Sequence, residues 1–532
     1  MPGQLPSVMN HSFSQVPHAN IQRSSFNRSH GLKTTFDAGQ LIPIFVDEAL
    51  PGDTFNIKMS SFGRLATPIN PFMDNMKLET FFFAVPNRLI WENWQKFMGE
   101  QENPGDSTDY LVPTVNAPTG GFDNGSLYDY FGIPTEVEIT DINNLHGRAY
   151  NLIYNEWFRD ENLQDSITVN KGDSGDDTDD YIIRKRGKRH DYFTSCLPFP
   201  QKGDAVNLPL GDIAPIRDAS GFGGSKLVFK DEISGNSRRL TVQAGGNVIA
   251  KTATNTTPTD TGDLLENMEV DLSEATSSTI NQLREAFQVQ RMYEKDARGG
   301  TRYTEMIKSH FGVTSPDSRL QRPEYLGGGS SFINVNPVAQ TSATDEITPQ
   351  GNLSAYGTVS ASGHGFNKSF TEHCVIIGLV CVRADLTYQQ GLNRMWSRQT
   401  RLDYFFPTLA NLGEQAVLSQ EIYADGTGTE ESGEGDYSVF GYQERYAEYR
   451  YKPSTITGKF RSNYAQSLDS WHLAQDFGNR PVLNDTFIEE NPPIDRVIAV
   501  PSEPHLILDC YFNFKCARPM PTYSVPGQID HF

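Results

Sequence analysis

The chain has few cysteines, and their number and spacing exclude a disulfide framework and a cysteine-based metal site. The five are Cys196, Cys374, Cys381, Cys510 and Cys516. Cys510 and Cys516 share one alternating run, in which six residues of strand span about 20 Å, whereas a disulfide needs Cα atoms within about 7 Å. Cys374 and Cys381 differ by an odd number and point to opposite faces of a strand. We expect free, mostly buried thiols in a reducing compartment.

Long hydrophobic runs are also absent, which argues against a membrane protein. No run approaches the roughly 20 apolar residues of a membrane span, and the N-terminus lacks the apolar core of a signal peptide. We therefore expect no membrane insertion.

The motifs of common enzymes are missing as well. There is no Gly-x-Ser-x-Gly, His-Glu-x-x-His or Cys-x-x-Cys. No Lys-Ser or Lys-Thr follows Gly327-Gly328-Gly329, so a flexible connection is favoured there over a phosphate loop. His373 and Cys374 are neighbours in a strand and should face opposite ways. We predict that the chain is not an enzyme and has no cofactor.

Acidic residues are absent before Asp37, although the chain has a formal net charge of −21. That total argues against a nucleic-acid binder. A protein with an acidic outer face and a basic inner face would account for both the negative total charge and the absence of acidic residues before Asp37. Residues 1–36 form a locally basic arm that carries cations and stackable rings, a combination that tolerates any single-stranded sequence. The candidate DNA contacts are Arg23, Arg28, Lys33, Phe13 and Phe26. The alternative is an arm that only laces neighbouring subunits together.

The hydrophobic pattern favours a mainly β fold. Phe55, Ile57 and Met59 alternate with polar residues, as in a half-buried strand. Residues 77–85 are almost continuously apolar up to Pro86, as in a strand covered on both faces. In the last third, 373–383 is apolar and 505–516 alternates. Aromatic residues make up 11 % of the chain, enough for a substantial core.

Helices are expected between these strands. Asn87 can cap a helix whose apolar face is Ile90, Trp94, Phe97 and Met98. Further helices are expected at 143–158, from 280 to Gly299, and from 303 to Gly312.

Residues 203–268 differ in composition from the rest. They are rich in Gly, Ser, Thr, Asn and Asp, and their only aromatic residues are Phe222 and Phe229. A β-hairpin around Ser234-Gly235-Asn236 is plausible. We interpret the segment as an inserted excursion from the main fold.

Two charged stretches adjoin. Residues 160–180 are acidic and rich in Gly and Ser. The acidic run 173–180 within them lacks the spacing and terminal Glu of an EF-hand loop, so a solvated loop is favoured, with weak Ca²⁺ binding left open. Residues 184–189 are a basic block that contacts either nucleic acid or the acidic run before it.

A third set of residues is rich in Arg, Trp and Tyr, the types enriched at the centres of protein interfaces. The candidate interface residues are Arg394, Trp396, Arg398, Arg401, Tyr442, Arg445 and Tyr449. Subunit contact is favoured over the alternative, an ordinary sheet surface with cross-strand ion pairs.

Several motifs occur in order along the chain and together carry a family resemblance. They are DARGGTRYTEMIKSHFGVTSPDSRLQRPEYLGGGS (296–330), FNRSH (26–30), LETFFFAVPNR (78–88), KRHDYFT (188–194), QQGLNRMW (389–396), FGYQER (440–445) and ARPMP (517–521). The sequence resembles the major capsid protein of the gokushovirus branch of the Microviridae, small icosahedral single-stranded DNA phages.

The resemblance implies an eight-stranded antiparallel jelly-roll β-sandwich with long loop and short-helix insertions. It further implies pentamers and a T=1 shell around circular single-stranded DNA, assembled in the host bacterial cytoplasm and found in the virion. A small basic packaging protein, an internal scaffold and a host surface receptor are possible partners. Residues 203–268 would project at the threefold axes and attach to the host.

The expected organisation is an interior-facing arm (1–36), the first strands with helical insertions (37–202), the surface insertion (203–268), and a helical connection with the remaining strands (269–532). Two rival functions remain. A glycan-binding β-sandwich adhesin needs an aromatic sugar platform, which the aromatic-poor insertion does not offer. An enzyme on a jelly roll needs convergent acid/base or metal groups.

Overall fold

The computed structural model describes residues 22–206, 228–230, 237–242, 248–252, 280–343 and 349–523. The chain divides into two compact units. One comprises residues 1–200 and 299–532, and the other comprises residues 201–298.

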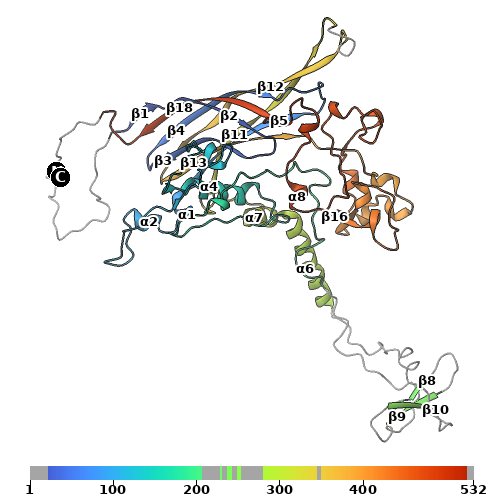
Figure 1. The fold of residues 1–532 in the computed structure, drawn as a ribbon. Coiled ribbons are helices and arrows are strands. Elements are labelled where there is room, and N and C mark those ends of the chain that lie inside the picture. The colour runs from blue at the N-terminus through green and yellow to red at the C-terminus, as the bar shows by residue number, and fades with distance from the viewer. Residues whose placement is uncertain are drawn as a thin grey trace. The chain divides into compact units, whose positions relative to one another are not determined.

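The first unit is built on one antiparallel sheet of nine strands (Figure 1). Its order is β1 (Ser24–Asn27), β18 (Leu506–Arg518), β4 (Thr54–Leu65), β12 (Leu353–Ser369), β11 (Glu324–Ala339), β5 (Met76–Pro86), β13 (Cys374–Ala384) and β3 (Ile42–Ala49), and β2 (His30–Phe36) also pairs with β18. The predicted mainly β, antiparallel fold is confirmed, with one strand more than the expected eight. Strands from both ends of the chain lie side by side, as β1 and β2 do with β18.

The sheet folds over on itself through β11. Residues 324–333 of this strand pair with β5, and residues 334–339 pair with β12. We call β1, β2, β18, β4 and β12 the β18 half, and β5, β13 and β3 the β13 half. The two halves face each other, since the ring of Phe45 on β3 lies 5.3 Å from that of Phe512 on β18. The result is a β-sandwich.

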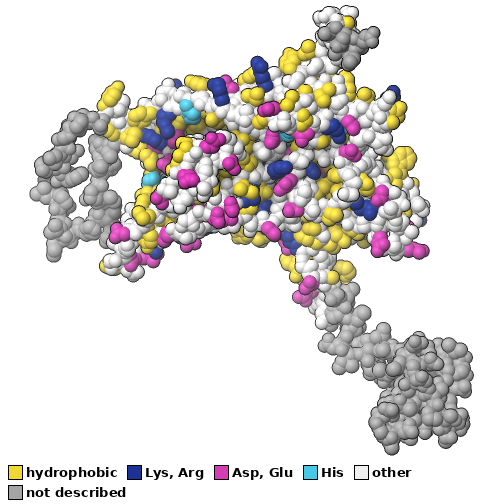
Figure 2. Space-filling model, viewed as in Figure 1, with side chains coloured by type: hydrophobic (Ala, Val, Ile, Leu, Met, Phe, Trp, Pro, Cys, Tyr) yellow, Lys and Arg dark blue, Asp and Glu magenta, His cyan; other side chains and the backbone are white. Residues whose placement is uncertain are grey.

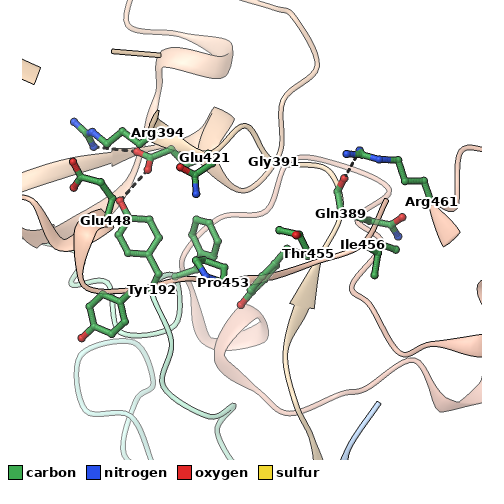
Figure 3. A pocket seen from close by; sticks show the side chains of 14 residues that line it. Tyr192, Gln389, Gly391, Arg394, Glu421, Glu448, Pro453, Thr455, Ile456 and Arg461 are labelled. Carbon is green, nitrogen blue, oxygen red and sulfur yellow. Dashed lines mark hydrogen bonds and ion pairs between the residues drawn. The ribbon is translucent and has the colours of Figure 1, made fainter. Parts of the chain in front are cut away.

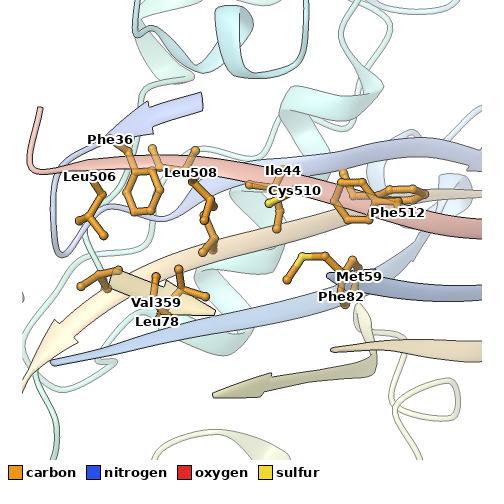
Figure 4. Close-up of a cluster of buried hydrophobic side chains, with 14 of the residues drawn as sticks. Phe36, Ile44, Met59, Leu78, Phe82, Val359, Leu506, Leu508, Cys510 and Phe512 are labelled. Carbon is orange, nitrogen blue, oxygen red and sulfur yellow. The ribbon is translucent and has the colours of Figure 1, made fainter. Parts of the chain in front are cut away.

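The main core fills the space between the halves (Figure 4). Alternation in β4 and β18 places every second side chain in this core, as predicted for both strands. Met59 and Phe512 point into it from one half, and Phe82 points into it from the other. All five cysteines are free and buried, as expected. Burial raises the pKa of Cys510 and Cys381 to about 12, so these thiols stay protonated.

Helices cover the outer face of the β13 half. These are α1 (Asn87–Ile90), α2 (Trp94–Phe97), α4 (Leu145–Ile153) and a π-helical turn (Tyr154–Phe158). A second core forms beneath them, where Val375 and Ile377 of β13 meet Trp91 and Tyr150. Helix at 143–158 is confirmed. The single helix expected after Asn87 is wrong: two four-residue helices form, and Asn87 is the first residue of α1 with no capping hydrogen bond from its side chain.

The other helices of the first unit are short. They are α3 (Leu127–Tyr130), α7 (Tyr303–Phe311) and α8 (Asp485–Ile488), with several 3-10 turns between residues 394 and 496. α7 ends as predicted at Gly312, whose φ of 69° favours glycine. Small two-stranded sheets pair β6 (Thr114–Val115) with β7 (Ile142–Asn143), β14 (Thr387–Tyr388) with β17 (Ser454–Thr455), and β15 (Glu414–Leu418) with β16 (Val439–Glu444).

The second unit contains a small antiparallel sheet in the order β10 (Val248–Thr252), β9 (Ser237–Val242) and β8 (Val228–Lys230). β8 and β9 form the predicted hairpin, although its tip at Ser234-Gly235-Asn236 lies outside the described residues. α6 (Ile280–Gly299) occupies the end of this unit and stops at Gly299 as expected. Among the described residues, no helix has the length and apolar character to cross a membrane.

The boundary predicted for the N-terminal arm is too late in the chain. β1 and β2 both lie within residues 1–36 and are hydrogen-bonded to β18. The two strands were not recognised in the sequence because their pattern is half polar, with the outer side chains of both strands facing solvent. Residues 1–21, including Phe13, lie outside the described residues.

Candidate assembly surfaces

A lobe formed by residues 386–488 carries all seven predicted interface residues. Its core includes Tyr388, Val417 and Phe440, together with Phe193 and Cys196 from earlier in the chain. The backbones of Leu197 and Tyr442 exchange two hydrogen bonds of 2.9 and 2.8 Å, which tie the lobe to that earlier segment. The lobe is thus a folded platform with defined surface side chains.

The surface of this lobe is strongly apolar. Trp396 is 71 % exposed and Leu402 is 61 % exposed. The full set of exposed large hydrophobic residues, which we call the lobe patch, is Leu392, Met395, Trp396, Leu402, Tyr404, Phe405, Leu412, Val439, Tyr449, Tyr451, Tyr464, Leu468 and Val482. Such a density of exposed aromatic and aliphatic side chains is typical of a protein interaction surface.

The arginines predicted for the interface are held by the lobe itself. Arg394 pairs with Glu421 at 3.1 Å. Arg398 pairs with Glu448 at 3.2 Å and lies 4.1 Å from the ring of Tyr449. These contacts order the aromatic rings of the lobe patch rather than leaving the guanidinium groups free.

The remaining three candidates differ in exposure. Arg401 is exposed and lies over the ring of Phe406 at 5.2 Å. Arg445 is half-buried and donates to the carbonyl oxygen of Leu402. Tyr442 is half-buried in β16. Sequence reasoning missed the exposed Leu402, Phe405 and Leu412, because apolar residues in a sequence are read first as core.

A cavity of about 70 Å³ lies where Tyr192 meets Arg394 and Glu421 of the lobe (Figure 3). The Tyr192 hydroxyl donates to Glu421 at 2.9 Å, while Arg394 binds the other carboxylate oxygen. Burial raises the pKa of Glu421 despite the nearby Arg394. Tyr192, Glu421 and Arg394 satisfy one another's hydrogen-bonding groups. They form a polar network at the cavity that fixes the structure of the lobe.

The candidate DNA contacts divide into paired and exposed groups. Arg28 makes a bidentate pair with Asp47, at 2.6 and 3.1 Å, and lies 5.1 Å from the ring of Phe514. Phe26 is half-buried. Arg23 and Lys33 are exposed, with Arg23 donating to Thr54 and Lys33 lying 3.5 Å from Asp509.

The basic block 184–189 makes many contacts inside the subunit. Arg186 pairs with Glu79, and Arg189 pairs with Asp385 at 2.5 Å. Lys188 is buried and donates to the carbonyl oxygen of Phe487 at 2.6 Å. Only Arg184 reaches the acidic run, through the carbonyl oxygen of Asp180. Arg186, Lys188 and Arg189 therefore have partners distant in sequence, which no local pattern could indicate.

The acidic run is only partly solvated, which corrects the prediction of a solvated loop. The Asp176 carboxylate is buried with Arg148, at 2.7 Å, and their side chains are 1 % and 0 % exposed. Asp173 accepts hydrogen bonds from Trp91 and Asn93. These carboxylates stabilise the helix layer. Among the described residues, no group of three or more His, Cys, Asp or Glu side chains is arranged to hold a metal ion.

A β-sandwich whose lobe exposes many aromatic and aliphatic side chains has the features of a structural subunit, one whose surfaces contact other macromolecules. Residues 14–528 match the family described as capsid protein (F protein). The chain belongs to this family of phage capsid proteins. It is a virion component and not an enzyme.

Three relatives cover almost the whole chain. Capsid protein VP1 of Bdellovibrio phage phiMH2K is 52 % identical over 98 % of both chains. Capsid protein VP1 of Chlamydia phage 1 is 47 % identical, again over 98 % of both. Capsid protein VP1 of Spiroplasma virus 4 is 39 % identical over 97 % of both. The resemblance to the gokushovirus capsid protein is thereby confirmed.

Proposed function

We propose that the chain is the major capsid protein of a T=1 icosahedral shell that encloses circular single-stranded DNA. The lobe patch carries this proposal, because an apolar surface of this density gains free energy when repeated interfaces bury it. Closed symmetry requires each copy to present complementary surfaces to its neighbours. The strand path of a jelly roll, implied by the resemblance, suits a subunit that presents different surfaces to different neighbours.

Assembly is tested by the mass and shape of the purified protein. Analytical ultracentrifugation with electron microscopy should show closed particles, or pentamers that feed them. Trp396→Ala with Leu402→Ala should reduce particle yield at least tenfold, because central aromatic side chains dominate interface energies. Met73→Ala with Leu111→Ala is the control, since both side chains are exposed and lie elsewhere. A 59.4 kDa monomer that binds glycans would favour the adhesin instead.

We further propose that the N-terminal region contacts the packaged DNA through Arg23 and Lys33. Both are exposed, whereas Arg28 is committed to Asp47. Arg23→Gln with Lys33→Gln should lower DNA retention in otherwise normal particles. Particles with unchanged genome content would contradict the proposal.

Residues 203–268 are proposed to project from the shell and attach to the host. The support is the composition shift and the separation of residues 201–298 as their own unit. Replacing 203–268 by a short Gly/Ser linker should leave assembly intact and reduce adsorption to host cells. Collapse of the subunit would show instead that the segment belongs to the core.

A further inference from the structure

Within the described ranges, no layer of helices packs on the outer face of the β18 half, unlike the outer face of the β13 half. Every second residue of β4 and β18 is exposed there. We call this surface the open sheet face. Its charged and aromatic side chains are Lys33, Lys58, Phe62, Arg64, Tyr356, Asp509, Tyr511 and Lys515.

The charge of the open sheet face is opposite to that of the whole chain. The chain has 66 Asp and Glu against 45 Lys and Arg. The open sheet face has four cations, Lys33, Lys58, Arg64 and Lys515, against Asp509 alone. Figure 2 shows Lys and Arg side chains standing out along the upper edge, where Figure 1 places β18, β4 and β12.

Most of these cations are not neutralised by a carboxylate of the described part of the chain and can interact with a partner. Lys33 lies 3.5 Å from Asp509, and both side chains are largely exposed. Within the described part of the chain, no carboxylate forms an ion pair with Lys58, Arg64 or Lys515. This contrasts with Arg186, Arg189 and Arg394, which are all paired internally.

Exposed aromatic rings stand among the cations. Phe62 is 46 % exposed, Tyr511 is 55 % exposed and Tyr356 is 51 % exposed. Phe62 of β4 pairs in register with Asp509 of β18, which is two residues from Tyr511. Phe62 and Tyr511 are therefore diagonal neighbours on one face, with their Cα atoms about 7 Å apart. The Arg64 guanidinium lies 5.8 Å from the Phe62 ring.

Small side chains lie next to both rings. In the register of β12 and β4, Ser360 pairs with Phe62, and Ser362 pairs with Ser60. In the register of β18 and β4, Ser60 pairs with Tyr511. Tyr511 therefore has Ser60 and Gly31 as its cross-strand neighbours, which leaves room for a flat group, while Phe62 has Ser360 on one side and Asp509 on the other.

We infer that the open sheet face binds single-stranded nucleic acid, with the cations along the phosphates and the rings of Phe62 and Tyr511 beneath the bases. Sequence-independent single-strand binding uses this combination of stacking rings and a basic track. A second copy of this acidic chain fits less well, because lysine is depleted at interface cores. The inference rests on the proposed enclosure of DNA, and it assigns the contact to a rigid sheet rather than to the arm alone.

The test is binding of a fluorescent 20-nucleotide oligo(dT) to the full-length unassembled subunit over a series of salt concentrations. Each cation that neutralises a phosphate of a single strand contributes about 0.7 to the slope of log K against log salt. Lys58→Gln, Arg64→Gln and Lys515→Gln together should therefore reduce the slope by about 2. Lys171→Gln, Arg319→Gln and Lys452→Gln change the same residue types at exposed positions elsewhere, and should leave the slope unchanged.

The aromatic rings give an independent readout. Phe62→Ala with Tyr511→Ala should weaken binding about tenfold or more, since stacking is lost, while the slope stays the same. Equal slopes for the wild type and the triple variant would overturn the inference. Wild-type subunits that assemble but show no salt-dependent binding would overturn it and leave the capsid function standing. Loss of assembly with unchanged binding would identify the open sheet face as a subunit contact.

Discussion

The two halves of the sheet share one core and differ in what lies outside it. β13 is buried along almost its whole length, because the main core lies on one face and the helix layer lies on the other. β4 and β18 alternate between buried and exposed residues. The β13 half therefore uses both faces for stability, while the β18 half leaves one face free for binding. A substitution on an outer face should thus affect folding in one half and recognition in the other.

The largest difference is expected for buried charge. Asp176→Asn leaves the Arg148 guanidinium buried without its ion partner, which should lower the free energy of unfolding by about 3–5 kcal/mol. The matched change in the β18 half is Asp509→Asn, whose partner Lys33 is exposed, and it should cost at most about 1 kcal/mol. Urea denaturation of the unassembled subunit measures both. Similar costs for the two variants would show that the helix layer does not exclude water.

Sequence patterns predicted the elements whose environment is uniform along their length. The alternation of 505–516 specified both faces of β18, and the apolar run 77–85 indicated a strand covered on both sides. Glycine predicted the end of α7, because Gly312 adopts a left-handed conformation. Composition also separated most of the second unit from the first.

Features that depend on distant partners could not be predicted in this way. The pairing of Arg148 with Asp176 joins a helix to a loop that reads as solvated. β1 and β2 are too polar to be recognised without β18 beside them. The open sheet face requires the register of four strands, which brings Lys58, Arg64 and Lys515 together from segments more than 400 residues apart.

A smaller contrast is expected for apolar side chains on the two outer faces. Ile377→Ala in β13 removes a fully buried side chain under the helix layer, and should cost about 2–5 kcal/mol. Ile507→Ala in β18 changes a side chain that is 60 % exposed, and should cost less than about 0.5 kcal/mol. The urea midpoints of the two variants give the comparison. A large cost at Ile507 would mean that the outer face of the β18 half is covered in the subunit.

Burial of a single carboxyl group beside the β13 half predicts a dependence of stability on pH. Burial raises the pKa of Glu490 to about 7, and its Oε1 accepts a hydrogen bond from the Ala384 amide. The folded subunit therefore binds this proton more tightly than the unfolded chain does. Between about pH 4.5 and 7 the folded state holds more protons, so the free energy of unfolding falls as the pH rises, by roughly 3 kcal/mol in all.

Glu490→Gln should remove this part of the pH dependence, because the amide keeps an acceptor for Ala384 and does not ionise. Urea denaturation from pH 5 to pH 8 measures the effect. Glu503→Gln, at an exposed position, is the control and should leave the profile unchanged. A Glu490→Gln profile parallel to that of the wild type would show that other groups cause the pH dependence.

A small effect on stability should accompany a gain in binding when Asp509 is neutralised. Asp509 is the one carboxylate among the charged residues of the open sheet face, and it lies 3.5 Å from Lys33. Asp509→Asn removes its repulsion of phosphate and releases Lys33, so oligo(dT) affinity at low salt should rise about two- to fivefold. The change in unfolding free energy should stay within about 1 kcal/mol. Affinity that is unchanged or falls would mean that nucleic acid does not follow this track of cations, and that the free face of the β18 half serves another partner.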